Sequence, residues 1–398
     1  MTKMSFGSVE EARRIARRRL PPAVYHYVEG GKDAEITAFA NELAFSRVFF
    51  SPRICSTRNR PDLSTTLLGR QIRMPLVIAP TGFVRVVHSD GEMGAARAAK
   101  AAGIPIAIST LCGEPAARIA EANDDTWFQL YMIGGRRGAQ HCIDLARAAG
   151  CRVLVVTADV AGLAQQDRMA RPLPSRVSLK EAFAFLPQAW NRPRWLLSLL
   201  RGGLEMRAPN APPKEDGSEM SLMEAGPLLV ATPPSWDDLA WIRERWDGPM
   251  VVKGILRIDD ARRAAEIGVD GISISNHGAK VLDGSPSTLS MLPGIADAVG
   301  DRIDILLDGG VRRGADIVRA CALGARAVLV GRPYLWGLAA GGEAGVAGIL
   351  RLMRHGMAAT MAQLGCASVA ELGPDALHPL PDFWRWNDVG VDLQSRLK

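Results

Sequence analysis

Eight short apolar runs, each followed by an alanine-rich stretch with helical spacing, recur along this chain from residue 74 onward. The runs are rich in β-branched residues and have the length of buried strands, whereas the stretches between them repeat apolar residues every three or four positions. The runs span residues 75–79, 104–108, 127–131, 153–157, 250–253, 272–275, 305–308 and 327–331. Because eight strand and helix units close a parallel barrel, we predict an α/β fold of the (β/α)8 TIM barrel type.

A doubly wound open sheet is the alternative fold for alternating strands and helices. Such a sheet usually carries a Gly-x-Gly-x-x-Gly motif after its first strand, but residues 80–83 here read Pro-Thr-Gly-Phe. The missing motif favours the barrel.

The spacing of the runs also divides the chain. Predicted strands four and five are separated by far more residues than one barrel repeat needs, so residues 160–234 form an insertion over the C-terminal mouth of the barrel. We expect helices around residues 179–200, with aromatic side chains that pack on the barrel or contact a membrane surface or a partner. Residues 202–226 are expected to be a mobile lid or disordered. The predicted parts are residues 1–73, an N-terminal helical segment packed on the barrel; residues 74–372, the barrel with its insertion; and residues 373–398, a C-terminal tail.

Composition and charge exclude several classes of protein. The formal net charge is +6, but the basic residues are spread along the chain without an aromatic stripe, so nucleic-acid binding is not expected. The six cysteines are widely separated and no histidine stands at metal-ligand spacing, which favours a reduced, metal-free cytoplasmic protein. We find neither a secretory signal nor a run of about 18 apolar residues, so no transmembrane helix is expected.

Four titratable residues stand at the ends of predicted strands. The carboxyl ends of the strands are where barrel enzymes build their active sites. A single buried residue of this kind is more often a structural ion-pair member than a catalyst, but four at equivalent positions indicate a catalytic site. The four are Asp159, Lys253, His277 and Asp308.

Two segments rich in glycine and arginine follow the last two predicted strands. Residues 308–314 read Asp-Gly-Gly-Val-Arg-Arg-Gly, and residues 331–333 read Gly-Arg-Pro. Glycine lets backbone N–H groups approach an anion closely, and arginine is a permanently charged bidentate donor. The loops after strands seven and eight are the usual phosphate site of this fold, so we predict a phosphate-bearing cofactor or substrate here.

Four motifs occur together near these strand ends. They are Phe-Gln-Leu-Tyr at 128–131, Ser-Asn-His-Gly-Ala at 275–279, Leu-Leu-Asp-Gly-Gly-Val-Arg-Arg-Gly at 306–314 and Gly-Arg-Pro at 331–333. In combination they resemble the FMN-dependent α-hydroxy-acid oxidase and dehydrogenase family, and the similarity extends from residue 24 to residue 366. The resemblance implies an enzyme that holds FMN and oxidises a carbon bearing a hydroxyl or amino group.

The resemblance also implies which residues hold FMN. Lys253 would lie near N1 and O2 of the flavin, where a fixed positive charge stabilises the anionic reduced ring. Ser275 would contact the flavin or its ribityl chain, and Asp308 the ribityl hydroxyls. The isoalloxazine ring would lie against Pro80, Thr81, Gly82, Ser109, Gln129 and Thr157, and the phosphate would be bound by Gly310, Arg312, Gly331 and Arg332.

By the same resemblance, His277 would be the base that takes a proton from the substrate's hydroxyl or α-carbon as two electrons pass to the flavin. Asp159 would orient the imidazole and stabilise its charged form. Tyr131 and Tyr25 match the substrate-contacting tyrosines of the family. Oxygen, a quinone or a protein carrier would take the electrons, and a homo-oligomer, a tetramer or larger, is implied.

The chain departs from the family at the two arginines that bind the substrate carboxylate. Lys280 stands three residues after the histidine, and Gln166 stands seven residues after Asp159. Lysine is a point charge and glutamine carries no charge, so small 2-hydroxy acids are expected to bind weakly unless Arg168 replaces the missing arginine.

Within the family, residues 192–195, 231–236 and 334–337 are similar to the subgroup that matures the peptide-derived redox cofactor mycofactocin. That subgroup oxidatively deaminates a cyclised peptide remnant, an amine without a free carboxylate, which agrees with Lys280 and Gln166. Two alternatives stay open: a flavin-binding or scaffold barrel that has lost catalysis, and a phosphosugar isomerase on the same fold.

Overall fold

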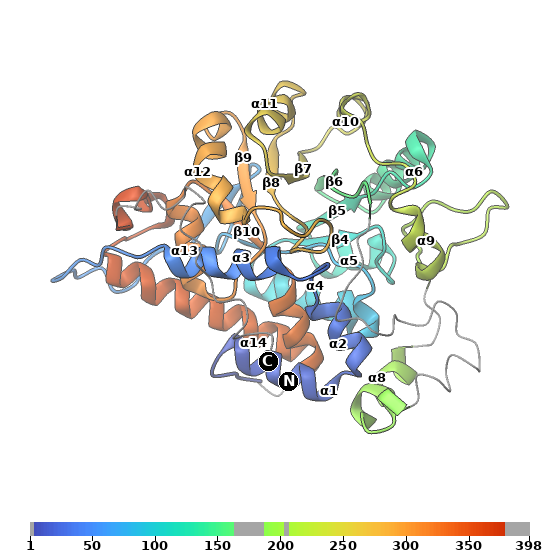
Figure 1. The fold of residues 1–398 in the computed structure, drawn as a ribbon, viewed down its shortest axis with the longest axis horizontal. Helices are drawn as coiled ribbons and strands as arrows, with labels where there is room; N and C mark the ends of the chain where they lie inside the picture. Colours follow the sequence, from blue (N-terminus) through green and yellow to red (C-terminus); the bar gives the residue numbers. More distant parts are fainter. Residues whose placement is uncertain (1–3, 163–186, 203–206, 379–398) are drawn as a thin grey trace.

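The computed structural model describes residues 4–162, 187–202 and 207–378. Within them, eight parallel strands close into a barrel in the order β10-β3-β4-β5-β6-β7-β8-β9 (Figure 1). Each predicted run overlaps one of these strands, so the prediction of a (β/α)8 barrel is confirmed. The strands are β3 (Leu76–Ile78), β4 (Ile106–Ser109), β5 (Thr126–Leu130), β6 (Val153–Thr157), β7 (Met250–Ile255), β8 (Gly271–Ile274), β9 (Asp304–Leu307) and β10 (Ala327–Val330).

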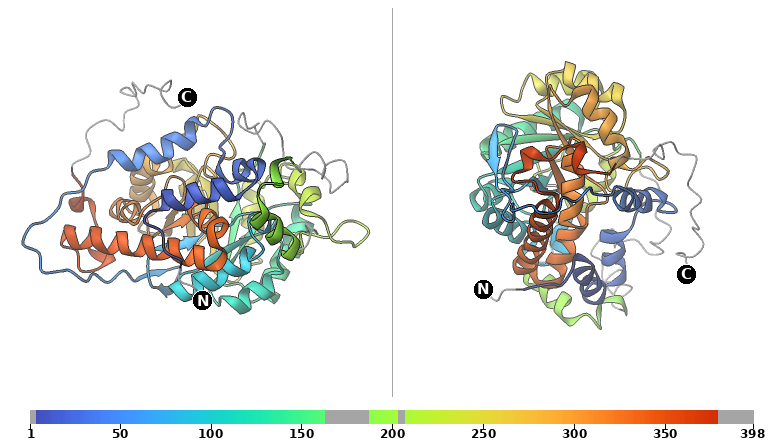
Figure 2. Two further views of the ribbon diagram at one scale, coloured as in Figure 1. Left: turned by 90° about the horizontal axis from the view of Figure 1, so that it is seen from below. Right: turned by 90° about the vertical axis from the view of Figure 1, so that its left-hand side faces the viewer.

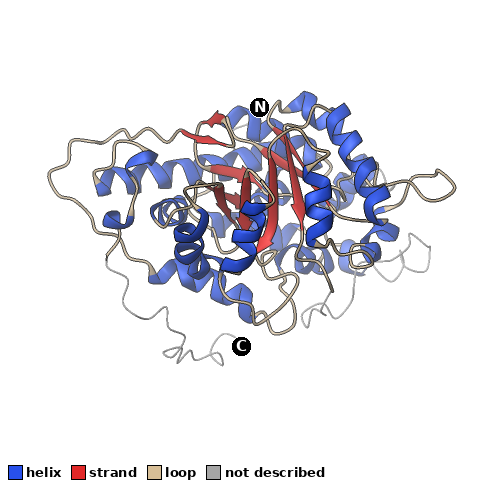
Figure 3. Ribbon diagram, turned by 90° about the horizontal axis from the view of Figure 1, so that it is seen from above, coloured by secondary structure: helices blue, strands red, loops and turns tan. Residues whose placement is uncertain are grey.

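Helices surround the strands (Figure 2, Figure 3). The strands themselves are buried on both faces, as expected of a parallel sheet covered by helices. Val77, Trp127 and Leu329 belong to one buried apolar cluster of the strands, so a solid core lies beneath the site. The helices are α4 (Gly91–Ala102), α5 (Ala116–Ala122), α6 (Gly135–Ala148), α10 (Trp236–Arg243), α11 (Ile258–Glu266), α12 (Thr288–Val299), α13 (Gly314–Ala322) and α14 (Arg332–Leu364), with 3-10 turns at Val84–Val86, Val369–Glu371 and Pro374–Ala376.

The segment before the barrel contains a hairpin as well as the expected helices. Leu68 and Gly69 form its turn with φ values of 48° and 77°, the positive values that a tight hairpin requires. The backbone N–H of Leu68 donates to Asp304 at the start of β9, so the hairpin covers the N-terminal end of the barrel, opposite the predicted site. The elements are α1 (Val9–Arg19), α2 (Pro22–Glu29), α3 (Ile36–Arg47), β1 (Thr65–Leu67) and β2 (Arg70–Ile72).

The described parts of the insertion are α8 (Pro193–Gly202), which agrees with the helix expected there, and α9 (Leu222–Leu228). The expectation of disorder over 202–226 is wrong for the residues described there. Asn210 is fully buried, and its side chain accepts from the N–H of Ala116 at 2.9 Å and donates to the carbonyl of Glu114 at 2.8 Å. None of the helices described here has the length and apolar character needed to cross a bilayer.

Candidate active site

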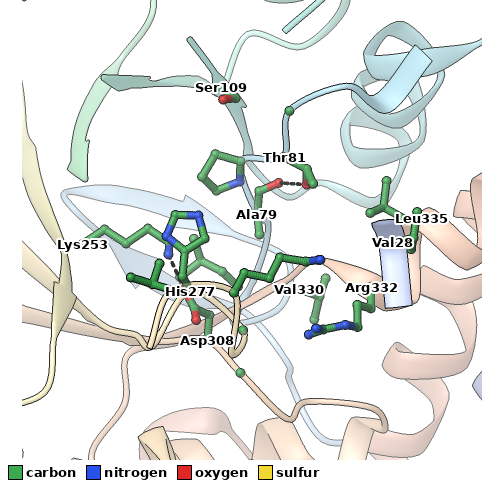
Figure 4. A pocket seen from close by; sticks show the side chains of 18 of the residues that line it. Val28, Ala79, Thr81, Ser109, Lys253, His277, Asp308, Val330, Arg332 and Leu335 are labelled. Carbon is green, nitrogen blue, oxygen red and sulfur yellow. Dashed lines mark hydrogen bonds and ion pairs between the residues drawn. The ribbon is translucent and has the colours of Figure 1, made fainter. Parts of the chain in front are cut away.

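A cavity of about 410 Å³ opens at the carboxyl ends of the barrel strands, beside α2 (Figure 4). Its volume lies within the range of small-molecule and cofactor sites, roughly 300–1,000 Å³. The predicted residues Asp159, Gln129 and Ser275 lie behind its wall, because each bonds a side chain of the lining. The predicted residues that line it are Pro80, Thr81, Gly82, Ser109, Tyr131, Lys253, His277, Lys280, Asp308, Gly310, Arg312, Gly331 and Arg332.

Asp159, His277 and Tyr131 form a row of hydrogen-bonding groups. Nδ1 of His277 lies 3.0 Å from Oδ1 of Asp159, and Nε2 lies 3.4 Å from the Tyr131 hydroxyl. A carboxylate only accepts, so the proton of the neutral imidazole belongs on Nδ1. Nε2 then carries a lone pair, which can accept a proton at the cavity.

The loop after β8 holds His277 in a rarely used backbone conformation. His277, Gly278 and Ala279 have φ values of 57°, 61° and 65°, which are three successive left-handed residues. For a residue with a Cβ, this conformation costs roughly 1–2 kcal/mol. The loop is fixed from outside, because the amide of Asn276 exchanges hydrogen bonds of 2.8 and 2.9 Å with Asn41 of α3. Such over-determined strain is frequent at functional sites.

Asp159 keeps its negative charge although it is largely buried. Burial alone would raise the pKa of this carboxyl, but the facing His277 and the nearby Lys253 lower it below its ordinary value. Asp159 packs directly against Gly254, and this position needs glycine, since a Cβ there would lie 2.5 Å from Cβ of Asp159. The ionised carboxylate of Asp159 therefore lies directly beside the imidazole ring.

Lys253 places a second charge at the cavity. Its Nζ donates to Oγ of Ser275 at 2.7 Å and lies 3.0 Å from Oδ2 of Asp308, and Ser275 donates to the same carboxylate at 2.9 Å. Burial lowers the pKa of Lys253, but Asp308 and Asp159 raise it above the ordinary value on balance. The Lys253 side chain therefore stays protonated in a water-poor site. Only in this charged form can it stabilise an anion there.

The loops after β9 and β10 meet at the far end of the cavity. A Cβ on Gly310, whose φ is 87°, would lie 2.2 Å from the carbonyl oxygen of Asn41, so this position needs glycine. A Cβ on Gly331 would meet no atom within 4 Å, so its backbone faces open space. Arg312 lies over the Trp336 ring at 5.2 Å and donates to Glu42 at 2.8 Å.

These residues fit FMN. Nε2 of Gln129 and Oγ1 of Thr157 are buried without a hydrogen-bond partner, which is costly unless a ligand with polar ring atoms supplies one. The open space at Gly331, next to the arginines, suits a phosphate. Among the residues with defined positions, no cluster of His, Cys, Asp and Glu side chains is arranged to hold a metal.

The two tyrosines of α2 correct one expectation. Tyr27 lines the cavity, and its hydroxyl donates to the carbonyl of Gly82 at 3.1 Å. Tyr25 does not line it, and its surroundings include Arg13 and Glu29. Residues two apart on a helix point to nearly opposite sides, so Tyr25 and Tyr27 cannot both face the substrate. The sequence places tyrosines at both 25 and 27, but it does not show which of the two side chains faces the barrel.

Lys280 and Arg332 both bind the C-terminal end of α2. Nζ of Lys280 donates to the carbonyls of Tyr27 at 2.7 Å and Gly30 at 3.0 Å. Arg332 donates to the carbonyls of Glu29 at 3.0 Å and Gly30 at 3.1 Å. Burial, together with Arg332 nearby, lowers the pKa of Lys280 well below its ordinary value, and burial lowers the pKa of Arg332 to about 10. The other two predicted substrate ligands, at 166 and 168, lie outside the described residues.

Comparisons with known proteins agree with this geometry. The sequence model of the FMN-dependent dehydrogenase family matches residues 16–379. The chain is 41% identical over 393 residues to the pre-mycofactocin synthase of Mycobacterium tuberculosis, covering 98% of each protein. It is 40% identical over 382 residues to the L-lactate dehydrogenase of Chromohalobacter salexigens, covering 94% of this chain and 96% of that one. The solved structure of a monotopic membrane protein, (S)-mandelate dehydrogenase, matches at a TM-score of 0.86 and 36% identity over 94% of this chain and 100% of its own.

Proposed function

This chain belongs to the FMN-dependent dehydrogenase family and is an FMN-dependent oxidoreductase, and from that premise we propose that His277 is the base that opens the oxidation of an amine. The observation that carries the proposal is the pair of contacts at His277: Oδ1 of Asp159 lies 3.0 Å from Nδ1, and the Tyr131 hydroxyl lies 3.4 Å from Nε2 at the cavity. Family membership decides against the phosphosugar isomerase and the non-catalytic scaffold.

Bound FMN would supply a two-electron acceptor. The ring contacts are assigned to residues 80–82, Ser109, Gln129 and Thr157, which line the cavity or lie behind its wall with unpaired polar atoms. Ser275 and Asp308 are assigned to the ribityl chain. The phosphate is assigned to Gly310, Arg312, Gly331 and Arg332.

In the proposed reaction, Nε2 of His277 takes a proton from the substrate. Asp159 offsets the positive charge that then forms on the ring and keeps its orientation. The Tyr131 hydroxyl, 3.4 Å from Nε2, holds the substrate's nitrogen or oxygen beside the base. Burial raises the pKa of this phenol, so Tyr131 acts as a neutral hydrogen-bonding group. Lys253, which lines the same cavity, holds a positive charge there.

The substrate we propose is a peptide-derived amine that carries no free carboxylate at the reacting carbon. In the family, a carboxylate would be bound at the position of Lys280, but two of the three N–H donors of the ammonium here are used by the carbonyls of Tyr27 and Gly30. The name of the pre-mycofactocin synthase relatives agrees with such a substrate. A 2-hydroxy acid is the second candidate, because an L-lactate dehydrogenase is nearly as similar.

We further propose a cytoplasmic homo-oligomer, a tetramer or larger, that passes its electrons to oxygen, a quinone or a protein carrier. Sedimentation velocity of the FMN-loaded protein checks the assembly.

Anaerobic stopped-flow flavin reduction tests the substrate proposal. We expect fast reduction by a cyclic peptide-derived amine and slow reduction by lactate, glycolate and mandelate, because a carboxylate in a partly desolvated pocket needs paired donors. Each acid is compared with its amide, which has the same shape without the charge. Rapid reduction by micromolar lactate would mean that Lys280 or Arg168 binds the carboxylate after all.

A further inference from the structure

Asn41, in the middle of α3, is a buried polar residue that bonds two other parts of the chain. It is 2% exposed, although it does not line the cavity. Its side chain exchanges hydrogen bonds of 2.8 and 2.9 Å with the side chain of Asn276, which directly precedes His277. Its Oδ1 also accepts from the backbone N–H of Thr288 at 3.2 Å, at the start of α12. An amide with these donors and acceptors around it is held in one orientation.

Asn276 passes this constraint to the loop that carries His277. Its Oδ1 accepts from the N–H of Ala279 at 3.2 Å, and its backbone carbonyl accepts from the same N–H at 2.9 Å. Its Nδ2 also donates to the carbonyl of Pro286 at 3.1 Å. The three left-handed residues 277–279 lie inside this turn. Because a residue with a Cβ resists that conformation, the Asn276 side chain is what keeps the turn closed.

On its other side, Asn41 meets the loop after β9. Oγ1 of Thr288 donates to the carbonyl of Asp308 at 2.5 Å. A Cβ on Gly309 would lie 3.0 Å from Nδ2 of Asn41 and 3.2 Å from Oγ1 of Thr288. A Cβ on Gly310 would lie 2.2 Å from the carbonyl oxygen of Asn41. Asn41 therefore packs directly against the backbone of the loop that we assign to the ribityl chain and phosphate of FMN.

We propose that Asn41 is a positioning residue that holds the His277 loop and the FMN phosphate loop in one fixed arrangement, so that each loop supports the other. The proposal rests on the roles proposed above for His277 and Gly310. Neither Asn41 nor the two residues that it bonds line the cavity, so an effect of Asn41 on FMN or on the base must pass through the two loops.

Ser275 links the same loops from the cavity side. Its Oγ accepts from the N–H of His277 at 3.0 Å and donates to Asp308 at 2.9 Å. Ser275 is itself assigned to FMN, so its substitution would mix a lost cofactor contact with a displaced loop. Substitution of Asn41 isolates the effect of the loop arrangement.

Flavin fluorescence titration of the protein without FMN tests the link to the phosphate loop. Asn41→Ser removes the amide and leaves a hydroxyl that is too short to replace it, so the Kd for FMN should rise at least about tenfold. Asn276→Ser should raise the Kd by a similar factor. The double variant should bind FMN about as tightly as the weaker single variant, because the two amides act as one unit.

Asn123→Ser is the matched control. Asn123 is also 2% exposed, and its amide donates to the carbonyls of Ala96 and Ile104 just before β5, at the opposite end of the barrel. This variant should melt at a lower temperature and keep the wild-type Kd for FMN. If Asn41→Ser does not fold, Thr288→Val replaces it, since it keeps the shape of Thr288 and loses only the hydroxyl that bonds Asp308. Its Kd for FMN should rise in the same direction.

Anaerobic flavin reduction by the proposed amine tests the link to the base. In FMN-saturated Asn41→Ser, the limiting rate should fall at least about tenfold with little change in KM, because the bound substrate meets a displaced base. Asn123→Ser should keep the wild-type rate.

A wild-type Kd in Asn41→Ser would overturn the proposal, and so would effects of the two asparagines that simply add. A raised Kd with a wild-type limiting rate would also overturn it, because Asn41 would then serve the phosphate loop alone. His277→Gln is the reference for the proposed function. If that variant reduces its flavin at the wild-type rate, the assignment of the base fails, whereas the FMN titrations still decide whether the two loops are linked through Asn41.

Discussion

In the proposed mechanism, the neighbours of His277 decide which of its nitrogens accepts the proton. Asp159 holds Nδ1, so only Nε2 is free to accept a proton. The strained loop and the glycine at 254 bring the two side chains within hydrogen-bond distance. A substitution that removes the charge of Asp159 and keeps its shape should therefore distinguish two effects of this residue: orienting the His277 ring and stabilising its positive charge.

Asp159→Asn is predicted to slow flavin reduction by roughly 10²–10⁴-fold while FMN stays bound, because the imidazolium loses its counter-charge.

The variant Asp159→Asn should also change the pH dependence of folding. The pKa of Asp159 is lowered in the folded protein, so its stabilising effect is present above the unfolded pKa of about 3.9 and is lost as the pH falls through the folded value. Chemical denaturation between about pH 2 and pH 6 should show a smaller acid-dependent loss for the variant. Asp297→Asn, at an exposed position of α12, is the control and should keep the wild-type slope.

At this scale, the positions of His277, Lys253 and Asp308 near the ends of predicted strands indicated that they would lie at one site, and all three line the cavity, although Lys253 lies within β7. The motifs did not predict that Tyr27, rather than Tyr25, lines the cavity, since that depends on how α2 is rotated against the barrel. They also did not predict that Lys280 bonds the end of α2, because its acceptors are backbone carbonyls that exist only after α2 docks.

Gly310 and Gly331, in the loops after β9 and β10, differ in what an added side chain would meet. Gly331→Ala adds a methyl group to open space in the cavity, so the protein without FMN should keep its melting temperature, while FMN binding weakens about tenfold or more from overpacking. Gly310→Ala places its methyl group against the backbone of Asn41, so this variant should unfold more easily even without FMN. Flavin fluorescence titration and thermal melts with and without FMN measure both. Loss of apo stability in Gly331→Ala would show that its backbone faces protein and not the phosphate.

The C-terminal end of α2 is held by side chains from two barrel loops. Lys280→Met removes the donor to the carbonyl of Tyr27 and one of the two donors to the carbonyl of Gly30, which should cost about 1–3 kcal/mol of the free energy of unfolding. Hydrogen exchange should then speed up locally over residues 22–31 and not over the strands. Lys100→Met, on the exposed side of α4, is the control. If exchange over α2 is unchanged, Lys280 does not hold this helix in place. Lys280 would then again be a candidate substrate ligand.

Elements were predictable where they repeat a pattern and unpredictable where they do not. The eight strands followed from their apolar runs, but β1 and β2 have three residues each and owe their pairing to the Leu68 and Gly69 turn. The residues after position 206 looked too rich in proline, glycine and charge to be ordered. They pack because Asn210 satisfies backbone groups of the loop before α5, which no local pattern encodes.

The barrel as a whole determines where the chemistry occurs but not the substrate. Identities of 41% and 40% to a pre-mycofactocin synthase and an L-lactate dehydrogenase are too close to discriminate between them. Fold, FMN and the His277 site follow from features that the family shares, whereas substrate choice follows from side chains at the cavity edge.

Anaerobic flavin reduction by the FMN-loaded wild type and His277→Gln, with the same amine substrate, tests the assembled site most directly. Equal flavin content in the two proteins, with reduction at least about 10²-fold slower in the variant, is predicted, because the proposal assigns His277 to the substrate and other residues to the phosphate. A variant that reduces its flavin at the wild-type rate would contradict the assignment of His277 as the base.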